Sequence, residues 1–293
     1  MTQEVKKSLI APYVALMKLR VVELLLVTTL PALFLASKGV PGLVTTIATL
    51  VGGTLAAGAS NAFNMVIEVD SDKLMKRTAK RPLATGAVTV KAATIFASLI
   101  SIISLAIFWI WTTPLATYLT LAAILFYVVG YTIGLKRRTS QNIVWGGIAG
   151  CMPVLIGWAA VTNSLSATAW YFFLLIFFWT PPHFWALAIK YRDDYEAAGI
   201  PMLPVVASIK NVQMQMWFHT IGMVITSLAV VWSAHFAGWI WGVTILLALG
   251  FSQQLIKLNT NESEKSAGKL FQWSITYLSV YSLLLVDKGS KST

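Results

Sequence analysis

The 293-residue chain is 57% hydrophobic and only 11% charged, with a mean hydropathy of +0.73 and a formal net charge of +11. Soluble domains carry roughly 25% charged residues, so this composition excludes an ordinary soluble protein and predicts an all-α integral membrane protein. The single cysteine, Cys151, excludes a disulfide framework and a cysteine-based metal cluster.

Nine apolar runs of about 20 residues, the length that spans the hydrocarbon of a bilayer, follow one another along the chain. They cover 17–36, 43–66, 93–112, 115–134, 142–161, 168–189, 213–234, 238–256 and 270–286. The N-terminal sequence, MTQEVKKSLIAPY, is too short and polar for a cleaved signal peptide. The simplest location is therefore a bacterial cytoplasmic (inner) membrane.

The basic residues predict the orientation. If the nine runs cross the membrane alternately, seventeen Lys and Arg fall on the side of the N-terminus and three on the opposite side. Because cytoplasmic loops are enriched in Lys and Arg, we expect a cytoplasmic N-terminus and an external C-terminus. The positive charge then reflects membrane orientation and an anionic substrate, not nucleic acid.

The stretch 60–86, SNAFNMVIEVDSDKLMKRTAKRPLATG, carries a dense cluster of charge. Asn64, Glu68 and Asp72 are spaced so that a helix would stack them on one face over about 12 Å, with Asp70 off that stripe. Oxygen ligands of this kind favour Mg²⁺ together with substrate phosphates. Arg77 and Arg81 follow, and Arg binds phosphate bidentately. The alternative is a solvated loop whose charges only fix topology.

The stretch 179–205, WTPPHFWALAIKYRDDYEAAGIPMLPV, carries a second acidic cluster. Two prolines, at 181 and 182, should kink or break the helix there. His183 follows at membrane depth, where an ionisable residue is a functional candidate. A continuous helix would place His183, Lys190 and Asp194 on one stripe. The alternative is a histidine that hydrogen-bonds a carbonyl freed by the prolines.

The two acidic clusters lie on the same side of the membrane and are four predicted helices apart. This spacing predicts a single domain, 1–293, built from two four-helix halves and a ninth helix, with both clusters at a shared site.

Three further groups of residues are candidates. Lys136, Arg137 and Arg138 are either a third basic wall around a diphosphate or an anchor that obeys the positive-inside rule. For Lys18, Arg20 and Glu23, at the start of the first apolar run, we favour snorkelling to the interface over lining a cavity. The aromatic residues beside His183 are candidates for a pocket wall, since aromatic faces stabilise cations: Trp179, Phe184 and Trp185.

At these segments the chain resembles the UbiA-type intramembrane prenyltransferases, and more closely their haem-modifying branch. The resemblance rests on Asn64, Glu68, Asp70 and Asp72 with RTAKRPLATG at 77–86, on YTIGLKRRTSQNIVWGG at 131–147, on WTPPHFWALAI at 179–189 and on DDYEAAGIPMLPVV at 193–206. It implies nine helices around a central cavity, and farnesyl transfer from farnesyl diphosphate to a vinyl group of haem B with addition of water.

The resemblance also implies residue roles. Asn64, Glu68, Asp72, Asp193 and Asp194 would bind Mg²⁺, while Arg77, Arg81, Lys136, Arg137, Arg138 and Lys190 would hold the diphosphate. His183 would lie near the haem, and contact with a haem A synthase or terminal oxidase assembly is implied. Two departures stand out: Glu68 replaces the usual Asp, and Lys18-Leu19-Arg20 lacks the usual central proline.

Other readings compete with this one. A prenyltransferase that acts on a quinone precursor or a chlorophyllide would use the same diphosphate machinery, and only the acceptor pocket would differ. A transporter would need polar residues at mid-depth in several helices, and a non-catalytic haem-handling assembly factor would not need carboxylates in metal register. The concentrated charge therefore favours diphosphate chemistry.

Overall fold

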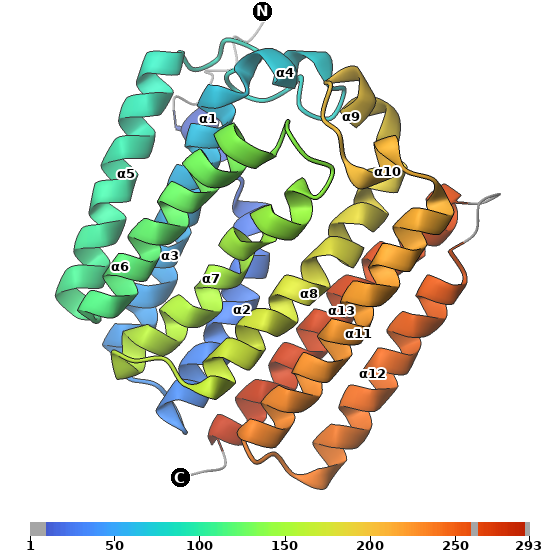
Figure 1. Ribbon diagram of the computed structural model, residues 1–293. Helices are drawn as coiled ribbons and strands as arrows, with labels where there is room; N and C mark the ends of the chain where they lie inside the picture. Colours follow the sequence, from blue (N-terminus) through green and yellow to red (C-terminus); the bar gives the residue numbers. More distant parts are fainter. Residues whose placement is uncertain (1–9, 259–262, 291–293) are drawn as a thin grey trace, which may run out of the picture.

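The computed structural model describes residues 10–258 and 263–290, and all regular secondary structure in these ranges is helical (Figure 1). The elements are α1 (Ala11–Met17), α2 (Leu19–Ser37), α3 (Leu43–Ile67), α4 (Val69–Leu74), α5 (Val90–Trp111), α6 (Pro114–Leu125), η1 (Phe126–Leu135), α7 (Asn142–Thr162), α8 (Ala167–Lys190), α9 (Arg192–Ala197), α10 (Leu203–Val206), α11 (Ile209–Ser233), α12 (Gly238–Ile256) and α13 (Ser263–Ser290).

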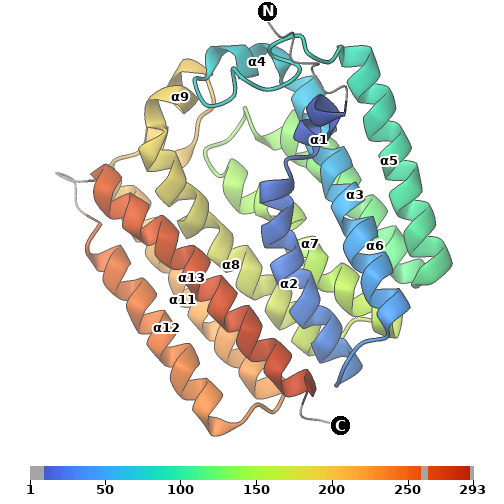
Figure 2. The ribbon, with the colours of Figure 1, turned by 180° about the vertical axis from the view of Figure 1, so that it is seen from behind.

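The long helices run side by side between two ends of the molecule (Figures 1 and 2). The short helices α4, α9 and α10 lie at one end, near α1, and α13 ends at the other end. The chain passes from α3 to α4 at Glu68 and from α8 to α9 at Tyr191. The two acidic clusters thus lie at the same end.

Within the described residues, seven helical segments are long and apolar enough to cross a membrane. They are Leu43–Ile67, Val90–Trp111, Pro114–Leu135, Asn142–Thr162, Ala167–Lys190, Ile209–Ser233 and Gly238–Ile256. The chain is therefore a multi-pass membrane protein. The predicted runs 17–36 and 270–286 fall on α2 and α13, but neither helix is among these seven; nine spans and their orientation remain predictions.

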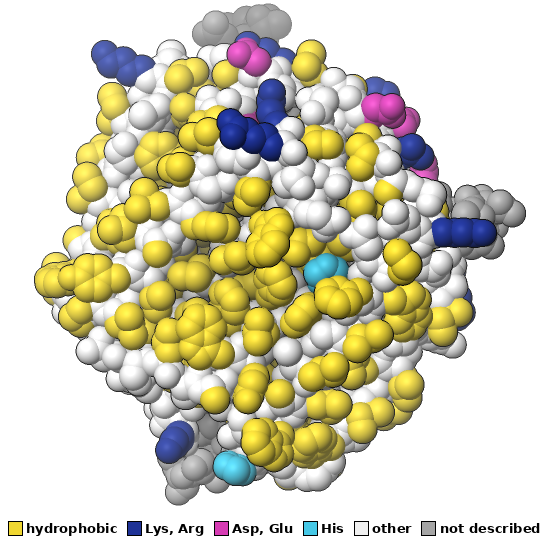
Figure 3. All heavy atoms as spheres, in the orientation of Figure 1, with side chains coloured by type: hydrophobic (Ala, Val, Ile, Leu, Met, Phe, Trp, Pro, Cys, Tyr) yellow, Lys and Arg dark blue, Asp and Glu magenta, His cyan; other side chains and the backbone are white. Residues whose placement is uncertain are grey.

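The surface agrees with this assignment. Apolar side chains cover a broad band of the face in Figure 3, whereas most acidic and basic side chains there lie at the end that carries α4 and α9. On η1 and the end of α6, Leu125, Val129 and Ile133 are each more than half exposed. Large apolar side chains that are exposed in this way are favourable where they contact lipid.

Small residues let the central helices approach closely, as is usual where membrane helices pack. A Cβ atom built on Gly157 of α7 would lie 3.1 Å from the backbone oxygen of Thr29 in α2. A Cβ atom on Gly147 would lie 3.0 Å from the Thr180 methyl carbon in α8. α7 therefore sits against both α2 and α8, and these three helices form much of the wall around the site.

The fourth predicted run, 115–134, contains a change of helix type. α6 begins after Thr113, whose hydroxyl accepts the Ala116 N–H, and it is α-helical to Leu125. From Phe126 to Leu135 the backbone is a π-helix, labelled η1. Periodicity along a single apolar run did not predict this change.

Candidate active site

A cavity of about 330 Å³ opens between α2, α3, α6, η1, α7 and α8. Its charged side chains gather at the end nearest α4 and α9, and its remaining wall is mostly apolar or small. The charged lining residues are Lys18, Glu68, Asp72, Arg77, Arg81 and Lys136. Four of these are cations and two are carboxylates, so this end of the cavity suits a polyanion and the rest suits a hydrocarbon chain.

Asn64, Glu68 and Asp72 form a column on one wall, as their spacing predicts. α3 ends at Ile67, and Glu68 leaves the helical region with φ −102° and ψ 12°. The hydrogen bonds nevertheless continue in the α pattern, because Glu68 N donates to Asn64 O at 3.0 Å and Asp72 N donates to Glu68 O at 2.9 Å. All three side chains are at least 96% buried.

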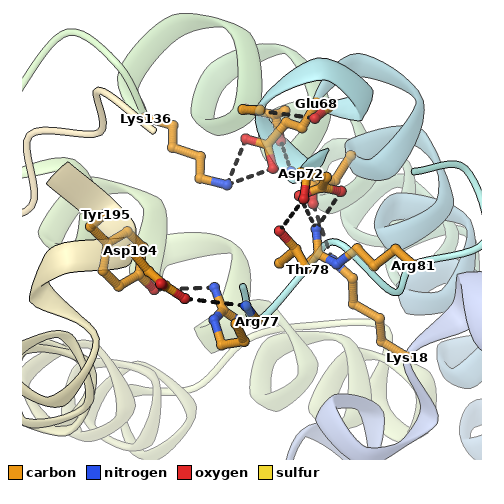
Figure 4. Close-up of polar contacts among 12 residues, drawn as sticks. Lys18, Glu68, Asp72, Arg77, Thr78, Arg81, Lys136, Asp194 and Tyr195 are labelled. Carbon is orange, nitrogen blue, oxygen red and sulfur yellow. Dashed lines mark hydrogen bonds and ion pairs between the residues drawn. The ribbon is translucent and has the colours of Figure 1, made fainter. Parts of the chain in front are cut away.

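Each member of the column has a cationic partner (Figure 4). Arg81 Nη1 contacts both Asp72 carboxylate oxygens at 2.6 and 2.7 Å, and Lys136 Nζ donates to Glu68 Oε2 at 2.6 Å. Lys18 Nζ donates to the Asn64 side-chain oxygen at 3.1 Å. A buried carboxylate without a partner is strongly destabilising, so these cations explain how the acidic column is stable in the absence of ligand.

Asp70 is the contrasting carboxylate. It is on α4 between Glu68 and Asp72, but its side chain is 92% exposed and pairs only with Lys73, at 3.2 Å. It does not line the cavity. Its position off the stripe is therefore a consequence of helical geometry, and it provides a natural control for Asp72.

Lys18 is a cavity residue, contrary to our preference for snorkelling. It lies in the left-handed region, with φ 51°, between α1 and α2, and this turn directs its ammonium group at Asn64. Burial lowers the pKa of Lys18 well below that of an ordinary lysine, and the neighbouring Arg81 and Lys136 lower it further. A bound polyanion would favour the charged form of this amine.

The second acidic cluster contributes less than predicted. α8 runs without a break through Pro181 and Pro182 to Lys190, and the helix is then interrupted at Tyr191, with φ −112° and ψ 30°. This interruption ends the predicted stripe. Lys190 and Asp193 are exposed and do not line the cavity, so the arrangement does not place them where their predicted roles require.

Asp194 does not line the cavity, but it lies beside Arg77, which does (Figure 4). Its Oδ2 atom accepts the Arg77 backbone N–H at 3.2 Å. The Arg77 guanidinium lies 5.7 Å from the centre of the Tyr195 ring and 5.8 Å from that of Tyr191, which are favourable cation–π distances. These contacts join the segment after α4 to α9.

The histidine of the PPHFW sequence is packed behind the cavity wall. Its Nδ1 atom is 2.7 Å from Ser274 Oγ, and its ring stacks on Trp179 and Phe271 with centroids 4.2 and 4.6 Å apart. His183 is 5% exposed and does not line the cavity. We also considered that His183 hydrogen-bonds a backbone carbonyl freed by the prolines. The structure shows a different partner for the ring, the Ser274 hydroxyl on α13.

The remaining predicted residues divide in the same way. Trp179 and Phe184 line the cavity, whereas Trp185 is fully buried outside it. Lys136 lines it, whereas Arg137 and Arg138 are exposed. Tyr127, Tyr131 and Tyr195 also line it, and sequence analysis missed all three. Tyr127 and Tyr131 could have been found from the sequence, because they are four residues apart and directly precede the basic cluster that begins at Lys136.

The donor set fits Mg²⁺ at the first cluster. No group of three or more His, Cys, Asp or Glu side chains is close enough to hold a metal within 10–258 and 263–290, so metal binding by the carboxylates of both clusters stays a prediction. Asn64, Glu68 and Asp72 still offer oxygen donors on one wall. Mg²⁺ typically takes one or two carboxylates and completes its shell with phosphate and water.

Comparisons with known proteins agree with this geometry. The sequence model of the UbiA prenyltransferase family matches residues 25–276. The chain is 48% identical to a protein of Renibacterium salmoninarum named Protoheme IX farnesyltransferase, over 94% of this chain and 88% of that one. It is also 48% identical to a protein of the same name from Streptomyces avermitilis, over 92% and 90%.

A solved structure shares the fold. The UbiA homolog from Archaeoglobus fulgidus, bound to DMAPP and Mg²⁺, superimposes with a TM-score of 0.69 and 16% identity, covering 94% of this chain and 99% of that one. At this identity the likeness establishes the arrangement of helices and nothing about substrates.

Proposed function

Because the chain belongs to the UbiA prenyltransferase family, we propose that it transfers a farnesyl group from farnesyl diphosphate to a vinyl group of protohaem IX (haem B). The products are diphosphate and haem O. The near-full-length similarity to proteins named Protoheme IX farnesyltransferase carries the choice of acceptor. A cavity with a cationic end and an apolar remainder supports the choice of an amphipathic prenyl diphosphate as donor.

Arg81 and Lys136 would hold the diphosphate and Lys18 and Arg77 would flank it, a role supported by the presence of all four side chains in the cavity wall. Cationic clamps of this kind stabilise the charge that develops on leaving oxygens. Bound Mg²⁺ would be held by Asn64, Glu68 and Asp72, and it would supply further positive charge to the same oxygens. In the structure Arg81 pairs with Asp72 and Lys136 pairs with Glu68. Substrate binding would exchange these carboxylate contacts for contacts with the diphosphate.

The reaction breaks the allylic C–O bond and leaves electron deficiency on the farnesyl group. The vinyl carbon of the haem forms the new C–C bond, and water then adds to the neighbouring carbon and loses a proton. Tyr127, Tyr131, Trp179 and Phe184 line the cavity, and their rings would stabilise the developing cation while the apolar wall excludes other water.

The acceptor side of the cavity is proposed to be the wall that contains Trp179 and Phe184. His183 supports this wall from behind through its stack on Trp179. This aromatic surface suits a flat macrocycle held by stacking.

The membrane arrangement is proposed from the charge count. Nine spans, with α2 and α13 as the first and the last, would place the charged end of the cavity at the cytoplasmic face of a bacterial inner membrane. The two four-helix halves would each deliver one acidic cluster to that face. A product that stays in the bilayer has to be collected there, which supports contact with a haem A synthase or an oxidase under assembly.

The test uses purified protein in detergent with haem B, farnesyl diphosphate and Mg²⁺, followed by extraction and mass measurement of the pigment. We expect a mass gain of one farnesyl group plus water, abolished by chelation of Mg²⁺. Asp72→Asn should lower turnover about 100-fold or more, because it removes a carboxylate from the metal-binding wall. Asp70→Asn is the matched control and should leave turnover unchanged.

Two outcomes would contradict the proposal. Absence of any prenylated pigment, with transfer to an aromatic quinone precursor instead, would replace haem as the acceptor and leave the diphosphate site intact. Equal losses in Asp70→Asn and Asp72→Asn would show that the buried column has no special role.

A further inference from the structure

The π-helix η1 contains Tyr127 and Tyr131 and is followed by Lys136, and all three residues line the cavity. Lys136 N donates to Tyr131 O at 2.9 Å, and Thr132 Oγ1 donates to Tyr127 O at 2.9 Å; each bond reaches five residues back. π-Helices are rare, and they occur frequently at functional sites. A ten-residue run of this kind in the wall of the cavity therefore requires an explanation.

The helix type determines which way Lys136 points. Tyr127 and Lys136 are nine residues apart, which is 2.5 turns of an α-helix at 3.6 residues per turn, so an α-helix would place them on opposite faces. A π-helix has about 4.4 residues per turn, and nine residues make about two full turns. Tyr127, Tyr131 and Lys136 can then share one face, and all three line the cavity.

The observed contacts follow the π register. Lys136 reaches Glu68 at 2.6 Å, and Thr132 Oγ1 accepts a hydrogen bond from Asn64 Nδ2 at 3.3 Å. In an α-helical register Arg138, eleven residues after Tyr127 and so about three α turns away, would face the cavity instead. Arg138 is exposed in the structure.

We propose that η1 is a positioning element of the active site, whose π register brings Lys136 to the diphosphate end on the same face as Tyr127 and Tyr131. The inference rests on the proposed function for the substrate, but the register itself does not. A π-helix can be viewed as an α-helix that accommodates extra chain length. Lys136 would then be the residue that holds the diphosphate only because this extra length rotates it inward.

The register makes an unusual prediction for deletions. Removing Val129 and Ile133, lipid-facing residues of η1 that are 56% and 52% exposed, leaves Tyr127 and Lys136 seven positions apart. In an α-helix seven positions make about 1.9 turns, so Lys136 stays on the tyrosine side of the helix. We therefore expect this deletion to be tolerated, with turnover within about threefold of wild type.

The matched control is deletion of Val51, a lipid-facing valine in α3 that is 46% exposed. α3 is an ordinary α-helix, so this deletion rotates Asn64 and everything after it by about 100°. We expect turnover to fall by at least about 100-fold. Insertion of one alanine after Val129 is a second control, which should move Lys136 off the cavity face.

A readout independent of catalysis is cross-linking. In a Cys151→Ser background, Lys136→Cys and Glu68→Cys should be joined by a short bifunctional thiol reagent, since the native side chains are in contact. The cross-link should persist when Val129 and Ile133 are deleted and should be lost on alanine insertion. All variants are first checked for a monodisperse peak in detergent.

The outcomes separate the two proposals. Loss of folding or of the cross-link on deletion of Val129 and Ile133 would overturn the positioning role of η1. If the cross-link persists in the deletion variant but the wild-type protein never transfers a prenyl group, the proposed function is wrong and the proposed register of η1 is still supported.

Discussion

At the residue scale, Ser274 of α13 holds two side chains of α8. Its backbone oxygen accepts the Trp179 indole N–H at 2.9 Å, and its hydroxyl lies 2.7 Å from His183 Nδ1. The same hydroxyl donates to Phe271 O at 2.6 Å. Because a serine hydroxyl has one proton, His183 Nδ1 must be the donor to it. This network sets the position of Trp179 in the cavity wall.

Ser274→Ala is therefore expected to reduce stability rather than chemistry. It leaves the buried His183 N–H without a partner, which typically costs about 1–3 kcal/mol. The measurement is thermal unfolding in detergent together with haem turnover at low temperature, which should stay within about threefold of wild type. Ser282→Ala is the matched control, since Ser282 is buried on the same helix and its hydroxyl has no partner.

The opposite pattern would restore His183 to a direct role. If Ser274→Ala kept the melting temperature but changed the absorption spectrum of bound haem, the histidine would have to contact the haem itself.

At the element scale, α7 approaches η1 so closely that only glycine fits at the contact. A Cβ atom on Gly146 would lie 2.2 Å from the Tyr131 ring, far inside van der Waals distance. Gly146 also lines the cavity. The position of Tyr131 is thus set by the neighbouring helix as well as by the register of η1.

Gly146→Ala should displace the Tyr131 ring and lower turnover about tenfold or more, and it should destabilise the protein by about 1–3 kcal/mol, as overpacking does. Gly242→Ala in α12 is the control, because a Cβ atom there meets nothing within 4 Å. An added methyl in an open helix position is neutral or favourable. Turnover and melting temperature are measured for both variants.

If Gly146→Ala kept wild-type turnover, Tyr131 could move without consequence. The packing of α7 on η1 would then be irrelevant to the site.

At the scale of the whole molecule, charge and apolar surface are separated along the helix axes. Most acidic and basic side chains of the face in Figure 3 lie at the end that bears α4 and α9, and apolar side chains cover the helices below. The cavity likewise has a charged lining and an apolar lining. An amphipathic substrate can therefore place its diphosphate at the polar end and its chain among the helices.

This separation predicts the result of labelling experiments in cells. Lys76→Cys lies at the polar end, and Ser164→Cys lies in the turn between α7 and α8 at the other end; both native residues are exposed. A membrane-impermeant thiol reagent should label Ser164→Cys in intact cells and Lys76→Cys only after permeabilisation. The native Cys151 is buried and should stay unlabelled. The reverse pattern would invert the proposed orientation.

The sequence alone determined the features that depend on local periodicity. The apolar runs predicted the helices, because a membrane helix needs about 20 apolar residues. The spacing of Asn64, Glu68 and Asp72 predicted their shared face, because backbone hydrogen bonds reach four residues back and continue even across the interruption at Glu68. The tyrosine-rich wall and the cationic partners of this column had no such local signature.

Tertiary structure decided everything that depends on packing between distant helices. It paired Lys136 with Glu68 across 68 positions, turned Lys18 into the cavity and enclosed His183 behind Trp179. It also left Lys190, the last residue of α8, and Asp193, which follows the interruption at Tyr191, exposed and outside the cavity. Helical spacing gives the direction of a side chain only while the helix type stays constant, and the π register of η1 and the end of α8 both change it.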